Sequence, residues 1–147
     1  MARRVTGQKK DKSQIEPDLP ALPRNFRVTI DGIEIGFSQI SRIGSETVEL
    51  PARGRAKLAH RYPNIVLRRA LGRDRGLYAW REIVMAGRKA PRDVEICLLD
   101  DAGQQVRGVW TLEGAWPCRW SGPLFDANAT EIAMEEVELA YARLIWR

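Results

Sequence analysis

A strictly alternating apolar pattern on both sides of an Asp-Gly pair is the feature that most constrains the fold of this chain. Asp-Gly is a favoured two-residue loop of β-hairpins, because both of its residues tolerate positive φ. Such a loop at Asp31-Gly32 aligns the flanking runs so that their apolar residues share one face. Those residues are Phe26, Val28, Ile30, Ile33, Ile35 and Phe37. The pattern predicts an antiparallel hairpin over residues 26–37 with one buried face.

A second extended run carries three tryptophans. Trp110, Trp116 and Trp120 share one parity, so an uninterrupted strand would place all three indoles on one face. Pro117 has no backbone donor, which predicts an edge position or a β-bulge. We interpret these residues, together with Trp80, as packing in the core or at an interface. A stacking platform for single-stranded nucleic acid is the alternative interpretation.

Residues 74–87 form the segment for which a helix is predicted. Asp74 suits the N-terminal cap and Gly87 suits the position just after the C-terminus. The apolar residues at helical spacing are Leu77, Trp80 and Val84. We expect this stripe to pack against a sheet.

The last segment is ambiguous between helix and strand. Glu135, Glu136 and Leu139 favour a helix by propensity. The same segment also alternates as a strand would, with a phase slip between two apolar sets that a β-bulge would explain. The first set is Ile132 and Met134, and the second is Val137, Leu139 and Tyr141.

The composition divides the chain into two parts, at residues 1–24 and 25–147. Residues 1–24 are basic and proline-rich with few large apolar side chains, so they cannot bury enough surface to offset the entropy of ordering. We expect a flexible basic N-terminal arm, either solvated or docked on a neighbouring subunit. The remaining length is typical of one domain with its own core.

A basic stretch without any acid largely accounts for the formal net charge of +5. Its members are Arg53, Arg55, Lys57, Arg61, Arg68, Arg69 and Arg73. We expect residues 51–63 to form a long loop, with a solvated His60, and residues 65–67 to form a short strand. The loop is interpreted either as a solvated surface or as a self-assembly contact. Nucleic-acid binding through phosphate contacts is a further alternative, although no recognition motif accompanies the charge.

The sequence carries no pattern that indicates catalysis, a cofactor or a metal. Cys97 and Cys118 lie in separate strand-like runs, which argues against a disulfide framework or a zinc site and indicates reduced thiols in cytosol. No uninterrupted apolar run reaches the roughly 18 residues of a membrane span, and the N-terminus has no apolar signal region. An enzyme with paired carboxylates is the alternative. The acids in question are Glu131, Glu135, Glu136 and Glu138, whose strand-like spacing suggests that they face solvent or a neighbour.

Residues 114–139 resemble the C-terminal signature of the tube protein of contractile phage tails and related injection machines. The matching features, in order, are Trp116-Pro117, Trp120, Gly122-Pro123, Ala127-Asn128 and the alternating segment from Glu131 to Leu139. Gly36-Phe37-Ser38 and the helix with its exit match the same family. The resemblance covers roughly residues 25–145.

The resemblance implies a mainly β, antiparallel β-sandwich or barrel-like tail-tube fold with one packed α-helix. It also implies that the final segment is a strand to about Tyr141, followed by a short helical or irregular tail. The implied function is that of a structural subunit and not of an enzyme. Copies of the chain would form rings, hexameric by analogy with the family, and these rings would stack into a hollow tube inside a contractile sheath. A tube-initiating or adaptor protein of the same fold at the baseplate is the alternative.

The partners implied are other copies of the chain, the sheath protein, and baseplate and spike proteins. The resemblance also implies cargo in the lumen of the tube, and nucleic acid enters only as such content. It does not imply a membrane as a partner. Assembly is expected in the cytoplasm. In the family, the loop that corresponds to residues 51–63 reaches an adjacent subunit or ring. The chain also separates a long acid-free basic segment from a Glu-rich final strand, and every copy in a homopolymer offers both. We therefore expect contacts between the basic residues of this loop and an acidic surface that includes some of the glutamates of the final strand. The candidates are Arg53, Arg55, Lys57 and Arg61 on one side, and Glu135, Glu136 and Glu138 on the other.

Overall fold

The computed structural model describes residues 24–147, so the predicted arm over residues 1–24 lies almost wholly outside the described part. The described elements are β1 (Phe26–Ile30), β2 (Ile33–Ile35), β3 (Gln39–Ile40), β4 (Glu46–Leu50), β5 (Lys57–Arg61), β6 (Ile65–Ala70), α1 (Gly76–Met85), β7 (Arg92–Leu99), β8 (Val106–Ser121), β9 (Met134–Ala140) and β10 (Arg143–Trp146). The prediction of a mainly β fold with one packed helix is confirmed.

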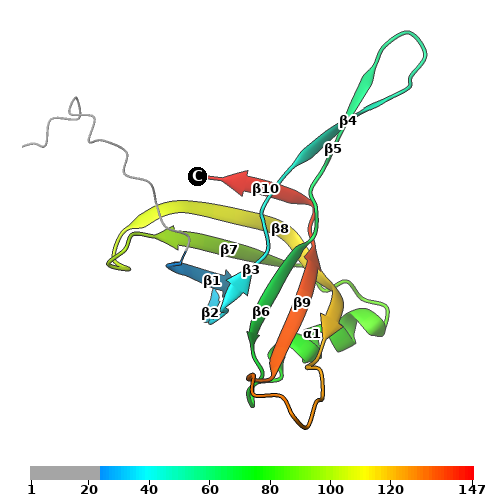
Figure 1. The fold of residues 1–147 in the computed structure, drawn as a ribbon. Coiled ribbons are helices and arrows are strands. Elements are labelled where there is room, and N and C mark those ends of the chain that lie inside the picture. The colour runs from blue at the N-terminus through cyan, green and yellow to red at the C-terminus, as the bar shows by residue number, and fades with distance from the viewer. Residues whose placement is uncertain (1–23) are drawn as a thin grey trace, which may run out of the picture.

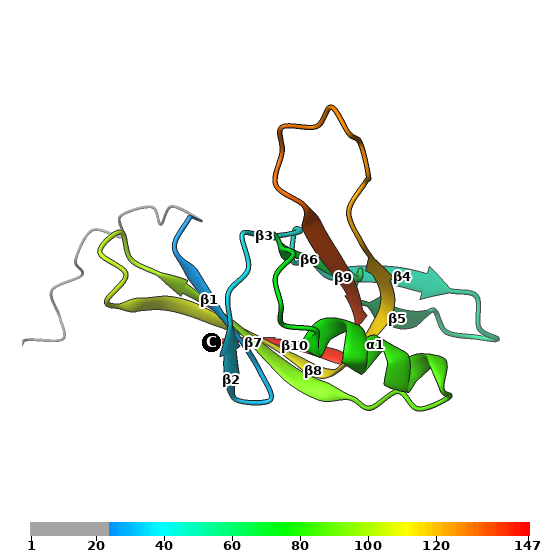
Figure 2. The ribbon, with the colours of Figure 1, turned by 90° about the horizontal axis from the view of Figure 1, so that it is seen from below.

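Eight of these strands form one antiparallel sheet in the order β2-β1-β7-β8-β9-β6-β3, with β10 also paired to β8. The long strand β8 joins the two halves of this sheet. Its first part pairs with β7 and β10, and its last part pairs with β9. The halves fold toward each other, as Figures 1 and 2 show, with α1 against β8. β4 and β5 form a separate two-stranded sheet.

The core lies between the two halves of the sheet and under α1. Its fully buried apolar residues come from both halves and from the helix. They include Val28, Ile65, Leu67, Leu77, Trp80, Val94, Leu112, Val137 and Leu139. Because strands distant in sequence supply these side chains, each half covers the apolar face of the other.

The hairpin predicted over residues 26–37 is present. Asp31 and Gly32 have φ of 55° and 79°, which fits a type I′ turn. The ladder pairs Ile30 with Ile33 and Val28 with Ile35, as predicted, but β2 ends at Ile35. Ile33 is exposed rather than buried, because β2 lies at the edge of the sheet.

The helix is shorter than predicted. It begins at Gly76, and Arg75 rather than Asp74 occupies the N-cap position. The Asp74 Oδ1 still accepts a hydrogen bond from the Gly76 N–H at 2.8 Å. Gly87 follows the C-terminus with a φ of 99°, as predicted from its freedom to adopt positive φ.

The strand β8 is not uninterrupted, so the condition under which its three indoles would share one face is not met. Gly114 has a φ of 65° within the strand, and the buried parity changes there. Before it the most deeply buried apolar side chain is Leu112, with Gly108 on the same parity and Thr111 just buried on the other, and after it Ala115 and Pro117 are buried. A second irregularity follows Pro117, as predicted, where the pairing with β9 shifts by one residue.

Two predictions about strand boundaries are also wrong. Residues 57–61 form β5 instead of part of a long loop, because they pair in register with β4. The tail after Tyr141 is the strand β10 rather than a helical or irregular segment, because β8 offers it a free edge. No bulge is needed within β9 to explain the phase slip between the apolar set of Ile132 and Met134 and the set that starts at Val137. The strand begins only at Met134, so Ile132 lies outside it, and β9 pairs with β6 without a shift.

Candidate assembly surfaces

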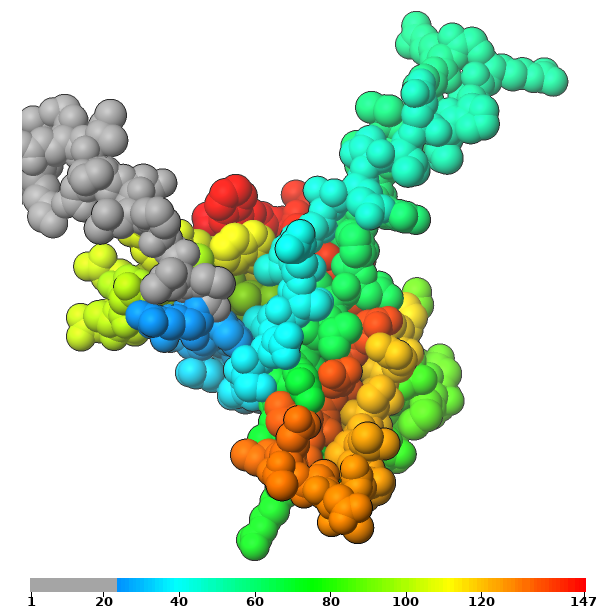
Figure 3. Space-filling model, viewed as in Figure 1, coloured from blue at the N-terminus to red at the C-terminus, as the bar shows by residue number. Residues whose placement is uncertain are grey.

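The β4–β5 hairpin is the first candidate surface. It projects away from the body of the subunit, at the upper right of Figures 1 and 3. Every residue of β4 is exposed, and in β5 Ala59 alone is half-buried. Isolated two-stranded hairpins are at best marginally stable in water. Since Val48, Leu50 and Leu58 leave apolar surface exposed, the hairpin has the character of a contact element.

Four predicted contact residues lie on this hairpin. Arg53 and Arg55 are exposed at its tip, and Lys57 begins β5 beside them. Arg61 lies at the base, where its Nε is 2.6 Å from the Glu46 Oε2. The tip therefore presents three exposed cations to a partner. Arg61 is instead paired with Glu46 of the same hairpin. His60 is exposed on β5, with its Nδ1 3.0 Å from the Thr47 hydroxyl.

The three predicted acids all lie on β9, but they are not equivalent. Glu136 and Glu138 are partly exposed and paired with basic residues on neighbouring strands. The Arg68 Nε lies 3.5 Å from the Glu136 Oε1, and an Arg119 guanidinium nitrogen lies 3.2 Å from the Glu138 Oε1. Asn64 also donates to Glu138 at 3.2 Å. Both acids can still contribute to a contact, because exposed pairs exchange partners at little cost.

Glu135 does not lie on the surface, and this corrects its assignment as a contact residue. Its side chain is 2% exposed, because it shares the core-facing parity of Val137 and Leu139. Its Oε2 lies 3.3 Å from the Arg69 Nε, and its Oε1 accepts a hydrogen bond from the Trp120 indole at 3.1 Å. We define Glu135, Arg69 and Trp120 as the buried polar cluster.

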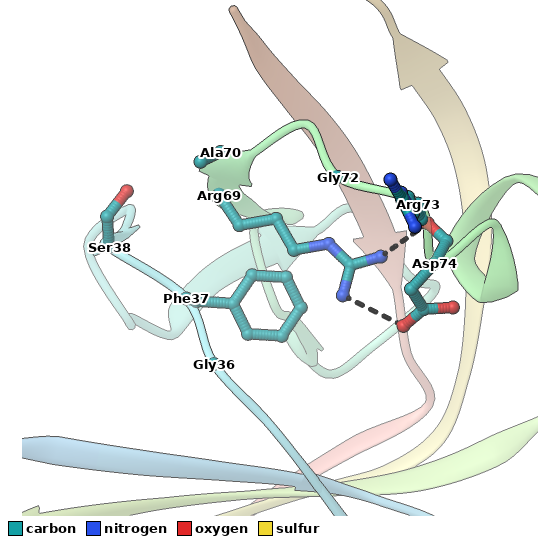
Figure 4. Close-up of a pocket in the computed structure, with 8 residues that line it drawn as sticks. All are labelled: Gly36, Phe37, Ser38, Arg69, Ala70, Gly72, Arg73 and Asp74. Atoms are coloured by element: carbon teal, nitrogen blue, oxygen red, sulfur yellow. Dashed lines mark hydrogen bonds and ion pairs between the residues drawn. The ribbon is translucent and has the colours of Figure 1, made fainter. Parts of the chain in front are cut away.

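The cluster extends to a shallow cavity of about 460 Å³ beside the start of α1. Figure 4 shows the Arg69 guanidinium between the Phe37 ring and Asp74. Its carbon lies 5.9 Å from the centre of that ring, and one nitrogen lies 3.3 Å from the Asp74 Oδ2. The Gly76 N–H, followed by the Arg69 charge, lowers the pKa of Asp74. Arg69 therefore joins β6, β9 and the entry to α1, which is a structural role.

The predicted tryptophans take different places. Trp80 is 1% exposed, and its indole donates to the Ala90 carbonyl at 2.8 Å. Trp116 is half-buried under Lys89, whose ammonium is 5.2 Å from the ring centre. Trp120 meets Tyr78 edge-on at 4.9 Å, and Trp110 stacks on Trp146 at 5.7 Å.

Sequence reasoning missed the apolar tip of the β8–β9 loop. Leu124 and Phe125 are 90% and 91% exposed there. The available signal was a pair of large apolar residues inside a segment whose glycine, proline and asparagine predict a loop.

Among residues 24–147, no three His, Cys, Asp or Glu side chains gather in a way that could hold a metal ion. In the same residues, no helix has the length and apolar character that a bilayer span requires. Burial, followed by the charge of Glu138, raises the pKa of the Cys118 thiol, which keeps the thiol protonated.

Comparison with known proteins places these surfaces in context. The family model described as T4-like virus tail tube protein gp19 matches residues 23–145. A chain of the PVC extracellular contractile injection system sheath-tube complex in the extended state is similar, with 26% identity and a TM-score of 0.73, over 93% of this chain and 97% of that one.

Two further solved structures are similar. A chain of the anti-feeding prophage tube terminating cap has 25% identity and a TM-score of 0.73, over 90% of this chain and 94% of that one. Hcp1 from Flavobacterium johnsoniae has 13% identity and a TM-score of 0.58, over 82% of this chain and 93% of that one, and it shares the fold. No curated protein sequence matches this chain significantly.

Proposed function

We propose, from the premise that this chain belongs to the T4-like virus tail tube protein family, that its copies close into rings and that these rings stack into the inner tube of a contractile tail or tail-like injection system. The chain is thus a structural subunit of a tube. Hexamers are the rings that the family resemblance implies. The projecting β4–β5 hairpin is the observation that carries the proposal, because no element among residues 24–147 covers its exposed apolar residues.

The edges of the main sheet support the same proposal. Within residues 24–147 its order ends at β2 on one side and at β3 on the other, so neither strand has a partner strand on its outer side in that part of the chain. A closed ring of identical subunits covers such edges with copies of the same chain. The sheath protein and the baseplate and spike proteins are the further partners proposed, and the lumen is proposed to carry cargo.

A terminating or initiating ring of the same fold is the second candidate function. It is favoured by one observation, the near-equal similarity to the sheath-tube chain and to the cap chain. The number of copies in one particle distinguishes the two, because a tube needs many rings and a cap or initiator needs one. We also propose assembly in the cytoplasm, where Cys97 and Cys118 would remain the free thiols that they are here.

Ring formation is the direct prediction of this function. The purified full chain should give closed rings in negative-stain images and a ring mass by light scattering. An obligate interface of this kind should bury roughly 2,000–5,000 Å² in total. A monodisperse monomer at high protein concentration and physiological salt would contradict the proposal.

The tip of the β4–β5 hairpin gives a second prediction. Changing Arg53, Arg55 and Lys57 together to Glu should leave the thermal unfolding of the subunit unchanged but shorten or abolish tubes, measured as tube length in electron micrographs. Each exposed charge pair contributes only about 0–1 kcal/mol, so the defect should depend on salt. Lys at Glu136 and Glu138 should restore part of the length, whereas Glu135 is no longer a suitable site for this rescue.

A matched control carries the same change of charge elsewhere. Arg73, Arg75 and Arg88 are exposed near α1, and their joint change to Glu should not shorten tubes. Normal tubes from the hairpin variant, or a loss of nucleic-acid binding in place of assembly, would show that the tip does not serve assembly.

A further inference from the structure

The loop between β8 and β9 presents an apolar tip to solvent. We define the tip as Leu124 and Phe125, which are 90% and 91% exposed, and Ile132 on the returning side of the loop is exposed as well. Gly122-Pro123 leads directly into the tip, and the fixed φ of proline restricts how far the tip can fold back. Large apolar side chains that lie next to each other and are almost fully exposed are typical of a contact site.

An apolar groove lies elsewhere on the same subunit. It has a volume of about 480 Å³, and the segment 38–43 forms one wall while β1, β7 and β8 form the other. Its apolar lining is Phe26, Ile40, Ile43, Ile96, Leu98 and Trp110. The two halves of the sheet do not close fully over these side chains, so the groove stays open to an incoming side chain.

Charge distinguishes the two surfaces. The loop and the start of β9, residues 122–136, contain four acids, Asp126, Glu131, Glu135 and Glu136, and no basic residue. Glu135 and Glu136 are paired with Arg69 and Arg68, so Asp126 and Glu131 carry the charge of the loop itself. The groove has one charged residue in its lining, the exposed Arg42, which forms no ion pair with any of residues 24–147. An acidic apolar tip and a basic apolar groove are complementary in both polarity and charge.

The tip and the groove lie apart on the subunit. In Figures 1 and 3 the β8–β9 loop forms the lower end of the molecule, whereas β1 and the segment around β3 lie higher, toward the centre. A contact between them must therefore join two copies. It is heterologous, because one copy supplies the tip and the other the groove, and such contacts build rings or stacks.

We propose that Leu124 and Phe125 of one copy insert into the groove between β1, β7, β8 and the segment 38–43 of a neighbouring copy, with Arg42 beside Asp126. The inference deepens the proposed function, on which it rests, because it names a second contact beside the β4–β5 hairpin. We infer that the groove is occupied by a second copy of this chain, because every copy carries one tip and one groove of complementary charge.

Cross-linking tests the contact directly. In a chain with Cys97→Ala and Cys118→Ala, the pair Phe125→Cys and Gln39→Cys places one thiol on the tip and one on the exposed rim of the groove. Oxidation of assembled protein should give a covalent ladder beyond the dimer, because a heterologous contact repeats from copy to copy. Neither single variant should give a ladder, and the pair Ala102→Cys and Gln39→Cys, with an exposed turn residue in place of the tip, should give none.

Other occupants give different products. Dimers from Phe125→Cys alone would mean that tips meet each other, and this would overturn the proposal. If the pair Leu19→Cys and Gln39→Cys instead forms a disulfide within one chain, detected as oxidised protein of monomer mass, the N-terminal segment occupies the groove. That result would overturn the proposal too. A missing ladder in tubes of normal appearance would refute the contact and leave the proposed function intact, whereas a parent chain that never assembles would refute both.

Substitution supplies an independent measurement. Leu124→Asp with Phe125→Asp should leave subunit unfolding unchanged, since both side chains are exposed, but should raise the protomer concentration needed for assembly by at least about a hundredfold. Arg42→Glu should weaken assembly, and Asp126→Lys in the same chain should restore part of it. Assembly at the parent concentration by the double Asp variant would overturn the proposal.

Discussion

Replacing Glu135 with Ala should lower the free energy of unfolding by about 3–5 kcal/mol, because it leaves Arg69 without its buried partner. The Arg69 side chain is 12% exposed, so water cannot fully solvate the charge that is left. The Trp120 indole would lose its acceptor as well. For a chain of this length, the expected fall in Tm is about 6–20 °C. Urea unfolding at matched protomer concentration is the measurement, since assembly itself adds stability.

Glu136 provides the matched control for this prediction. It is the next residue of β9, and its partner Arg68 is half-exposed. Glu136→Ala should change the free energy of unfolding by only about 0–1 kcal/mol. Equal losses from the two variants would show that burial of Glu135 is not what makes it important. Joint replacement of Glu135 and Arg69 by Met should be milder than Glu135→Ala alone, because Glu135→Ala leaves the buried Arg69 with only the exposed Asp74 as a partner, whereas the double variant leaves no buried charge at this site.

Replacing Trp80 with Ala should have an effect of similar size, about 3–5 kcal/mol, because it removes a large side chain from a closely packed site. Trp80 is the largest fully buried side chain of residues 24–147, and it fixes α1 on the sheet. Its indole N–H also donates a hydrogen bond to the Ala90 carbonyl, and the Arg92 guanidinium lies 4.9 Å from the centre of its ring. Chemical denaturation together with the near-ultraviolet circular dichroism of the tryptophans would measure the loss.

Trp146 is the matched control for Trp80. It is 71% exposed and stacks on Trp110 with an angle of 4° between the rings. Trp146→Ala should cost much less, because a stacked aromatic pair contributes about 0.5–1.5 kcal/mol beyond the burial of area. A Trp80 variant as stable as the Trp146 variant would show that the helix is held by other contacts.

Both predictions concern the interior of the subunit, and they separate its stability from its assembly. The β4–β5 hairpin and the β8–β9 tip are exposed, so changes there should alter assembly while the subunit keeps its stability. Changes at Glu135 or Trp80 should instead reduce the amount of folded subunit, and assembly should fail only as a consequence. Measuring unfolding and tube length on the same variants distinguishes these cases.

Several features of this protein follow from short-range patterns in its sequence. Alternation around Asp31-Gly32 sets the β1–β2 hairpin, because the turn type and the period of a strand are local properties. The helical stripe and Gly87 likewise locate α1 and its end. The ordered motifs of residues 114–139 indicated the family that the comparison then showed.

Whether a given residue is buried, paired or exposed depends instead on contacts between strands that are distant in the sequence. Gly114 turns β8 over and separates the indoles, and the pairing of β6 with β9 carries Glu135 to Arg69, 66 positions away in the sequence. The apolar groove likewise needs side chains from β1, β3, β7 and β8 together. Periodicity describes each strand alone, whereas burial depends on which distant strands it meets, and long-range pairing settles that question.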